Sequence, residues 1–301
     1  MKKVCGGVDI GGTNTVFGWV ESNGNFLYKG SVKTKDFDDP KDLVKAVCRH
    51  LLSNLMENEA VAVGIGAPNG NYYNGTVECA PNLNWPDYVP LKDYFHEYFD
   101  MPVLVTNDAN ATALGEMVYG SAKGVNNFMM VTLGTGLGSG FVSNGQLIYG
   151  HDAFAGELGH VIVEENGRQC GCGRKGCLET YVSATAISRT ALEMTAKNYT
   201  SAQVFEEAKK GTKWALEAFD FTTRKLGLAL ANAVAITSPR KIYLFGGLAQ
   251  AGELLFKLTK KYMEENLLAI YKGKIELLPS ALEGVDAAIL GASALAWKEI
   301  S

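Results

Sequence analysis

Cysteine and histidine gather in one stretch of this sequence. Residues 156–179 hold three of the six cysteines, Cys170, Cys172 and Cys177, and His160 shortly before them. Tetrahedral zinc takes four nitrogen or sulfur ligands, and one histidine with three cysteines is a common structural set. Glycines between the thiols let a short loop fold back so that the sulfurs face one point. The spacing predicts a zinc site formed by these four side chains.

A disulfide, or a group of three buried thiols, is the alternative interpretation of this cluster. Cys170 and Cys172 are too close in the chain for an easy bridge, and any pairing leaves a third thiol over. Zinc is therefore the favoured interpretation. Glu157 and Glu179 flank the cluster, so a metal here would hold a loop whose two ends carry hydrogen-bond acceptors.

Two glycine turns of similar design lie about 120 residues apart. In each, an apolar run precedes the glycines, a second apolar run follows, and a Ser-Asn-Gly turn then reverses the chain. The first turn contains Gly11 and Gly12, and the second contains Gly134 and Gly136. Exposed backbone N–H groups in such turns suit a phosphate. The repetition indicates duplicated domains, each with a phosphate-binding turn, although either turn alone fits an ordinary β-turn.

Two aspartates stand at the ends of predicted strands. Asp9 ends the strand at residues 4–9, where it could hold Mg²⁺ through water. Asp108 lies between a predicted strand at residues 102–106 and a predicted helix at residues 109–117. That position suits a helix N-cap. It also suits a catalytic base, because ligands of open α/β sheets bind beyond the carboxyl ends of strands. This segment alone favours the cap, and the two roles are compatible.

The rest of the chain has an α/β pattern. Periodicity and turn residues predict helices at residues 40–55, 91–99, 184–196, 201–209, 213–237, 253–266 and 285–299. Further strands are predicted at residues 61–66, 128–133, 140–142, 241–245 and 275–278. A loop at residues 68–86 is too long for a simple connection, and long ordered loops often bind ligands.

Charge and hydropathy disfavour several classes of function. The net charge of -4 over 301 residues provides neither a basic surface for nucleic acid nor a polybasic patch for anionic lipid. No apolar segment is long enough to span a bilayer, and Asp9 interrupts the first apolar run too early for a signal peptide. Cys5, Cys48 and Cys79 have no evident partners, which fits a reducing compartment. We expect a cytoplasmic protein without nucleic-acid or membrane partners.

Taken in order, these motifs resemble the ROK family of bacterial sugar kinases, within the actin-like ATPase superfamily. The cluster of His160 with cysteines is specific to this family among sugar kinases. The matching segments span nearly the whole chain and are residues 9–13 (DIGGT), 80–83 (APNL), 107–110 (NDAN), 133–136 (LGTG), 156–160 (GELGH), 170–173 (CGCG), 176–179 (GCLE) and 246–247 (GG).

The resemblance implies an α/β fold of two actin-like (ribonuclease H-like) domains with a central cleft. Residues 1–106 and 286–301 would form the smaller N-terminal domain, and residues 107–285 the larger C-terminal domain with a zinc-stapled loop at 160–177. A homodimer is expected from the same resemblance.

The resemblance also implies ATP-dependent phosphorylation of the C6 hydroxyl of a hexose, with glucose as the best single choice. Asp108 would be the base that takes the hydroxyl proton, with Mg²⁺ and ATP as cofactors and Zn²⁺ as a structural ion. The sugar would be bound by Asn82, Asn107, Asp108, Glu157, His160 and Glu179. The nucleotide side would comprise Asp9, Gly11, Gly12 and Thr13, then Gly134, Thr135 and Gly136, and finally Gly246 and Gly247.

Three alternatives stay open at this point. The substrate could be another hexose or an N-acetylhexosamine, such as fructose, mannose, allose, N-acetylglucosamine or N-acetylmannosamine. A sugar-sensing repressor of the same family is disfavoured, because the first strand begins at Val4 and the net charge opposes DNA binding. A zinc-dependent interaction module would leave Asp108 and both glycine turns unexplained. Asn69 stands where the family has glycine after Pro68, so the contribution of Asn69 and Gly70 to sugar contact is unassigned.

Overall fold

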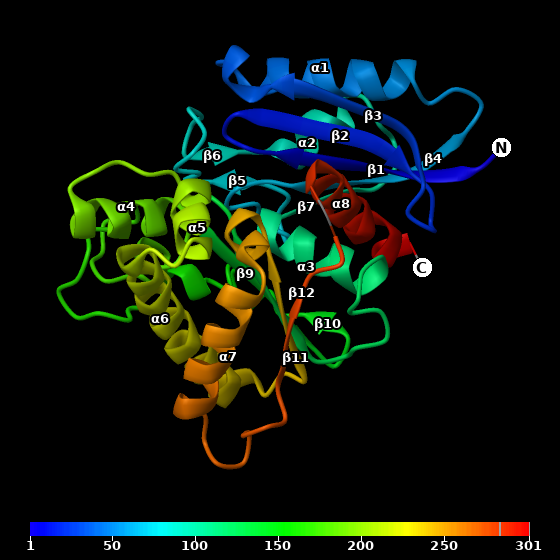
Figure 1. Cartoon of the computed structure of the whole chain (residues 1–301). Coiled ribbons are helices and arrows are strands. Elements are labelled where there is room, and N and C mark those ends of the chain that lie inside the picture. Colours follow the sequence, from blue (N-terminus) through cyan, green and yellow to red (C-terminus); the bar gives the residue numbers. More distant parts are fainter. Residues whose placement is uncertain (283, 301) are drawn as a thin grey trace. The chain divides into compact units, whose positions relative to one another are not determined.

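The computed structural model describes residues 1–282 and 284–300, which form two compact units. Unit 1 comprises Met1–Val125, Leu147–Ala155 and Ala281–Ser301, and unit 2 comprises Asn126–Gln146 and Gly156–Ser280. Each unit contains a mixed five-stranded sheet with helices packed against it (Figure 1). The predicted α/β class is confirmed.

The sheet of unit 1 has the strand order β3-β2-β1-β4-β7. Its strands are β1 (Lys3–Ile10), β2 (Asn14–Val20), β3 (Phe26–Lys33), β4 (Glu59–Gly66) and β7 (Val103–Thr106). The first three form an antiparallel meander, and β4 and β7 continue the sheet in parallel with β1. Asp9 pairs with Gly66, and Gly66 pairs with Thr106, so the three parallel strands end together at one edge.

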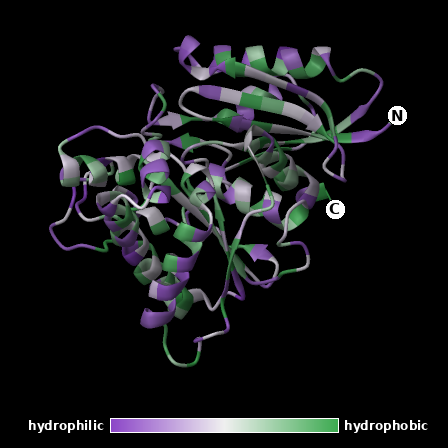
Figure 2. Cartoon of the chain, in the orientation of Figure 1, coloured by the Kyte–Doolittle hydropathy of each residue, from purple (hydrophilic) through white to green (hydrophobic). Residues whose placement is uncertain are grey.

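The helices of unit 1 are α1 (Pro40–Ser53), α2 (Leu91–His96), α3 (Asp108–Val118) and α8 (Gly284–Ile300). A single 3₁₀ turn, η1 (Thr34–Asp36), precedes α1, and a two-stranded ribbon of β5 (Val77–Glu78) and β6 (Tyr88–Val89) organises the long loop. Asp39 caps α1 by accepting a hydrogen bond from the Lys41 N–H, with Pro40 at the first helical position. Hydrophobic and hydrophilic residues alternate along α1 in Figure 2, and its buried positions include Leu43, Val47 and Leu51.

Glycine allows α8 to lie unusually close to the sheet of unit 1. Gly7 of β1 and Gly64 of β4 are paired neighbours in the register. A Cβ atom on Gly7 would overlap the carbonyl oxygen of Ile289, and one on Gly64 would overlap the carbonyl oxygen of Ala292. Both carbonyls belong to α8, so this pair of glycines forms the flat surface on which the helix rests.

Unit 2 repeats the strand topology of unit 1. Its sheet has the order β10-β9-β8-β11-β12, with β8 antiparallel to β9 and parallel to β11, and β11 parallel to β12. The strands are β8 (Phe128–Leu133), β9 (Leu137–Ser143), β10 (Gln146–Leu147), β11 (Lys241–Phe245) and β12 (Glu276–Pro279). The predicted repetition of strand, glycine turn, strand and hairpin is thus confirmed at the level of topology.

The helices of unit 2 are α4 (Ala184–Thr195), α5 (Ser201–Lys209), α6 (Lys213–Thr237) and α7 (Glu253–Asn266). Short 3₁₀ turns occur at η2 (Leu158–His160), η3 (Leu178–Thr180) and η4 (Gly247–Ala251). The long helix α6 buries Phe219, Leu226 and Leu230 in the core of this unit. Among the residues that the structure describes, no helix is both long enough and apolar enough to cross a membrane.

Some element boundaries differ from those predicted. Helix α2 ends at His96, before the end expected at residue 99, and α3 begins at Asp108 with Asn107 as its N-cap. The two units also divide differently from the predicted boundary at residues 106/107, because α3 belongs to unit 1. Helix α3 packs against α8 of the same unit, where Gly115 faces the backbone of Gly291.

The close approach of α8 to β1 predicts that Gly7→Ala is destabilising. The added methyl group meets backbone atoms of Ile289 and Ser293, which cannot rotate away, so we expect a loss of about 1–3 kcal/mol of unfolding free energy. Gly6→Ala is the matched control, because its Cβ meets only side-chain atoms of Val63 and Trp19, at 3.1–3.3 Å. Urea unfolding of both variants measures the difference. Equal losses for both variants would contradict this account of the helix contact.

Candidate active site

Two carboxylates meet at the edge of unit 1 where the parallel strands end. Asp9 is the penultimate residue of β1, and Asp108 is the first residue of α3, just beyond β7. Gly66 lies between them, and a Cβ atom there would stand 3.2 Å from Oδ1 of Asp9 and 3.6 Å from Cα of Asp108. A glycine at the end of β4 therefore leaves room for the Asp9 carboxylate and for the backbone at the start of α3.

Asn107, and not Asp108, is the N-cap of α3, so the N-cap interpretation of Asp108 is wrong. The side chain of Asn107 accepts a hydrogen bond from the Ala109 N–H at 2.8 Å, and its backbone is extended, as a cap residue requires. Asp108 also accepts from the Ala109 N–H, through Oδ1 at 2.8 Å. The cap and the carboxylate therefore share one donor at the positive end of the helix.

The surrounding protein disfavours the charged form of both carboxylates. Burial, and secondarily the negative charge of Asp108, raise the pKa of Asp9 to about 7. Burial also raises the pKa of Asp108, although hydrogen bonds from its own backbone and from Ala109 oppose the shift. Asp108 is nevertheless an exposed residue, although protein atoms crowd its carboxyl group, so this end of α3 is open to a ligand. A reachable carboxylate with a raised pKa is suited to take up a proton.

The first glycine turn lies beside Asn82. Its ends are closed by a hydrogen bond from the Gly11 N–H to the Asn14 carbonyl at 3.0 Å, and Gly12 and Thr13 are exposed. A Cβ atom on Gly12 would stand only 2.6 Å from the Asn82 carbonyl oxygen. Asn82 and the turn are therefore packed backbone to backbone, although they are far apart in sequence.

The second glycine turn, in unit 2, is held by the segment that follows the cysteines. Oε2 of Glu179 accepts a hydrogen bond from the Leu137 N–H at 2.9 Å, and a Cβ atom on Gly136 would overlap that carboxylate. The Ala184 N–H donates to the Gly134 carbonyl at 2.9 Å. A side chain at position 136 would therefore displace the Glu179 carboxylate from its bond with Leu137.

Gly246 and Gly247 follow β11, the parallel neighbour of β8, so both glycine segments lie at the same edge of this sheet. Gly246 has a φ of 102°, and a Cβ atom there would stand 2.7 Å from the Leu133 carbonyl oxygen. Around Gly134 and Gly247 an added Cβ atom would meet nothing within 4 Å. The exposed side of these turns thus has room for a ligand.

A hollow of about 440 Å³ adjoins the second glycine turn. Besides Thr135, it is lined by the first turns of α4 and α5 and by the segment between these helices. Its lining is rich in hydroxyl and amide side chains: Thr135, Thr185, Ser188, Asn198, Thr200, Ser201 and Gln203. The hollow can therefore offer polar groups next to the glycine turn.

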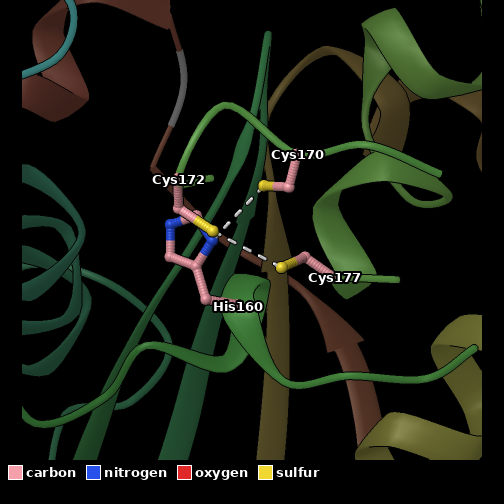
Figure 3. A group of neighbouring side chains, drawn as sticks. All are labelled: His160, Cys170, Cys172 and Cys177. Carbon is pink, nitrogen blue, oxygen red and sulfur yellow. Dashed lines mark hydrogen bonds between the residues drawn. The ribbon is translucent and has the colours of Figure 1, made fainter. Parts of the chain in front are cut away.

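The predicted metal ligands come together in unit 2. One ligand atom from each of His160, Cys170, Cys172 and Cys177 lies within 4.8 Å of every other (Figure 3). Nδ1 of His160 is 3.7 Å from the Cys170 sulfur, and the sulfurs of Cys172 and Cys177 are 3.6 Å apart. Zinc–sulfur bonds of about 2.3 Å in a tetrahedron place ligand atoms roughly 3.8 Å apart, so the geometry fits zinc. All six cysteines are free thiols, which contradicts the disulfide alternative.

The loop of the cluster has the local geometry that its glycines predict. The Gly173 N–H donates to the Cys170 carbonyl at 3.1 Å, and Gly173 has a φ of 87°, which favours glycine. The backbone N–H of Arg174 is the main reason that the pKa of Cys172 is lowered to about 6. Burial instead raises the pKa of Cys170, and it raises the pKa of Cys177 to about 12.

The two nitrogens of His160 face different partners. Nδ1 faces the cysteine cluster, whereas Nε2 lies 3.9 Å from Oε2 of Glu157. Ser139 supports the start of this segment: its hydroxyl donates to the Gly156 carbonyl and accepts from the Leu158 N–H at 3.2 Å. Ser139 was not among the predicted residues, because nothing in the local sequence connects β9 with residues 156–158.

The predicted site residues therefore form two groups. Asp9, Gly11, Gly12, Thr13, Asn82, Asn107 and Asp108 belong to unit 1. Gly134, Thr135, Gly136, Glu157, His160, Cys170, Cys172, Cys177, Glu179, Gly246 and Gly247 belong to unit 2. Within each unit the residues meet at the carboxyl ends of parallel strands or in the loops beside them.

Comparison with known proteins identifies the family. The model of the ROK family matches residues 5–299. A glucokinase of Thermotoga maritima is 35% identical, with 98% of this chain and 97% of the relative covered. A xylose repressor of Bacillus spizizenii is 32% identical, with 85% of this chain and 66% of the repressor covered. The structure of a ROK family glucokinase from Streptomyces griseus, in complex with glucose and AMPPNP, superposes with a TM-score of 0.82 at 32% identity, covering 98% of this chain and 99% of that one. On the family match and these relatives, the chain belongs to the ROK family.

Proposed function

We propose that this chain is an ATP-dependent hexose kinase that transfers the γ-phosphoryl group of ATP to the C6 hydroxyl of glucose. The chain is similar to glucokinases over nearly its whole length, and this similarity supports the assignment. The single observation that carries the mechanism is Asp108, a reachable carboxylate with a raised pKa at the carboxyl edge of a parallel sheet.

Asp108 is the general base in this proposal. Its carboxylate accepts the proton of the C6 hydroxyl as that oxygen forms a bond to the γ-phosphorus and the bond from the γ-phosphorus to the β,γ-bridging oxygen breaks, which leaves ADP. The Ala109 N–H holds Oδ1 at 2.8 Å and so fixes the direction of the carboxylate. Asn107 keeps the backbone of this turn in place as the cap of α3.

Asp9 is proposed to hold Mg²⁺ through water, close to the first glycine turn. A bound Mg²⁺ neutralises charge that develops on the phosphate oxygens during transfer. The cation would also favour the charged form of Asp9, against the burial that now raises its pKa. The exposed amides of Gly12 and Thr13 suit one phosphate group, those of Gly134–Gly136 suit another, and Gly246 and Gly247 are assigned to the adenosine.

The sugar is proposed to be held by hydrogen bonds from fixed polar side chains. A hexose is uncharged and densely hydroxylated, so it needs donors and acceptors in defined positions. Asn82, Asn107 and Asp108 supply them from unit 1. Glu157, His160 and Glu179 supply them from unit 2, with Nε2 of His160 on the side of Glu157 and away from the cysteines.

Zinc is proposed to be structural, bound by His160, Cys170, Cys172 and Cys177. These ligands lie between Glu157 and Glu179 in sequence, so the ion would hold both acceptor-bearing ends of the loop. Structural zinc contributes on the order of 10 kcal/mol to the folding of small zinc-binding peptides, which is ample to order a loop of this size.

A cytoplasmic location, a homodimer and a role in glycolysis remain predictions.

A sugar-responsive transcription regulator is the second candidate, because the similarity extends to xylose repressors. Both candidates require sugar binding, but only the kinase requires a base placed for phosphoryl transfer. A coupled assay for ADP with a panel of hexoses and N-acetylhexosamines separates them. The same panel, compared by kcat/KM, identifies the preferred sugar.

The first prediction concerns Asp108→Asn. The amide cannot accept the hydroxyl proton, so we expect kcat with glucose to fall about 10²–10⁴-fold while the Kd for glucose stays within a few-fold. Asp93→Asn, which removes an exposed carboxylate from α2, is the control and should be silent. Near-normal turnover by the Asp108 variant would remove this residue from the mechanism.

The raised pKa of Asp9 predicts a pH-dependent stability difference. The folded-state pKa of about 7 exceeds the ordinary value of 3.8, so the folded protein binds this proton more tightly than the unfolded chain. The resulting stabilisation is complete below about pH 4 and is lost as the pH rises through about 7. Asp9→Asn does not titrate, and its stability relative to wild type should improve from pH 5 to pH 8. Urea unfolding in magnesium-free buffer measures this, and a pH-independent difference would contradict the assigned pKa.

The cysteine cluster predicts one tightly bound zinc per chain. Cys172→Ser should lose most of the metal and expose residues 160–177 to proteolysis, because the remaining ligands no longer complete a tetrahedron. Cys79→Ser is the matched control, since Cys79 is also an exposed free thiol but lies outside the cluster. Elemental analysis of the purified proteins measures zinc content. Active wild-type protein without zinc would refute the assignment.

A further inference from the structure

Arg168 is a buried cation that the proposed mechanism does not use. Its side chain is only 9% exposed, although arginine is seldom buried without partners. It stands in the cysteine loop, two positions before Cys170, and all of its contacts lie within unit 2. Burying a guanidinium costs free energy unless its donors are satisfied, so the partners of Arg168 indicate what it is held for.

The guanidinium of Arg168 joins three segments. Nη1 donates to the Thr180 carbonyl at 2.7 Å, and Nη2 donates to Oγ1 of Thr190 at 3.0 Å. Nη2 also forms an ion pair with Oε2 of Glu193 in α4. The planar group lies 4.9 Å from the ring centre of Tyr181. One side chain thus connects the cysteine loop, the residues after Glu179 and the helix α4.

The backbone of Arg168 adds two further contacts to the same region. Its N–H donates to the hydroxyl of Tyr181 at 2.7 Å, and its carbonyl accepts from the Gly176 N–H at 2.8 Å. The second bond ties the two arms of the cysteine loop together next to Cys177. Arg168 therefore holds the chain on both sides of Glu179.

Glu179 lies in the short turn η3, and Arg168 bonds to the last residue of that turn, Thr180. The Thr180 N–H and hydroxyl both bond to the Cys177 carbonyl, at 3.0 and 2.8 Å, which closes the turn at its start. The bond from Arg168 to the Thr180 carbonyl closes it at its end. With both ends of the turn held, Oε2 of Glu179 accepts the hydrogen bond from the Leu137 N–H. The other carboxylate oxygen, Oε1, takes no part in that bond.

We propose that Arg168 is a positioning residue for the reaction, which holds Glu179 in the orientation that binds the sugar. This inference rests on the proposed function. Arg168 acts through the Thr180 carbonyl and touches neither the cysteine ligands' sulfur atoms nor the glycine turn. Its side chain therefore acts on neither the zinc ligands nor the nucleotide turn directly, and any effect on that turn would pass through the bond from the Leu137 N–H to Glu179.

Arg168→Lys is the test variant, because lysine keeps the charge but cannot make the forked set of bonds from one planar group. We expect the KM for glucose to rise about 10-fold, within the roughly 100-fold loss that a 1 Å misplacement can cause. The KM for ATP should rise by no more than one fifth of the factor by which the KM for glucose rises. The zinc content should remain at one ion per chain.

Arg189→Lys is the matched control. Arg189 pairs with the other oxygen of the same Glu193, at 3.0 Å, but it is 47% exposed and is an i,i+4 partner on the helix surface. The Arg189→Lys variant should have a KM for glucose within twofold of that of the wild type. A purely structural role of Arg168 would lower the melting temperature without changing the ratio of the two KM values.

Glu193→Gln keeps the test decisive if Arg168→Lys does not fold. Glu193→Gln weakens the ion pair that holds the guanidinium and retains the bond to Thr180. The KM for glucose should therefore rise about two- to fivefold, more than in Arg189→Lys.

An unchanged KM for glucose in the folded Arg168 variant, or equal effects of the Arg168 and Arg189 variants, would overturn the proposal. Wild-type protein that phosphorylates no hexose would instead refute the proposed function.

Discussion

The meeting of two carboxylates at the end of a parallel sheet is the constraint on which the rest of this structure depends. Asp9 and Asp108 are brought together because β1, β4 and β7 end in register, and Gly66 leaves room between them. Burial, and secondarily the negative charge of Asp108, disfavour the ionised form of Asp9, and its pKa is raised accordingly. Ionising buried carboxylates costs free energy, and a cation or a hydrogen-bond donor beside them offsets that cost. In the proposed kinase, Mg²⁺ and the sugar hydroxyl are those partners.

The duplicated topology gives each unit the same means of exposing a glycine turn. In both, the first strand of the sheet leads into glycines and then into an antiparallel partner, while two parallel strands follow on the other side. The units then differ in what they place at that edge. Unit 1 supplies carboxylates, whereas unit 2 supplies the cysteine loop with Glu157 and Glu179. Glu179 also bonds to the backbone beside the second glycine turn, so a residue assigned to the sugar supports a turn assigned to phosphate.

The parts of the site that could be predicted from the sequence are those formed by neighbouring residues. The cluster of His160 with Cys170, Cys172 and Cys177 is local, and its ligand spacing alone indicated that the four side chains meet. The choice between Asn107 and Asp108 as the helix cap could not be made in this way, since both types suit the position and only the backbone geometry separates them. The contacts of Ser139 and of Arg168 join segments whose proximity depends on the whole fold of unit 2, and no local pattern marks them.

The distance from Asp108 to the reacting oxygen tests the central claim most directly. A crystal structure of the wild-type protein with glucose and a non-hydrolysable ATP analogue would provide it. The account predicts a carboxylate oxygen of Asp108 about 2.6–3.2 Å from the C6 oxygen of the sugar, the range that proton transfer requires. A well-ordered glucose whose C6 oxygen lies more than about 5 Å from both oxygens of Asp108, with no water between them, would contradict it.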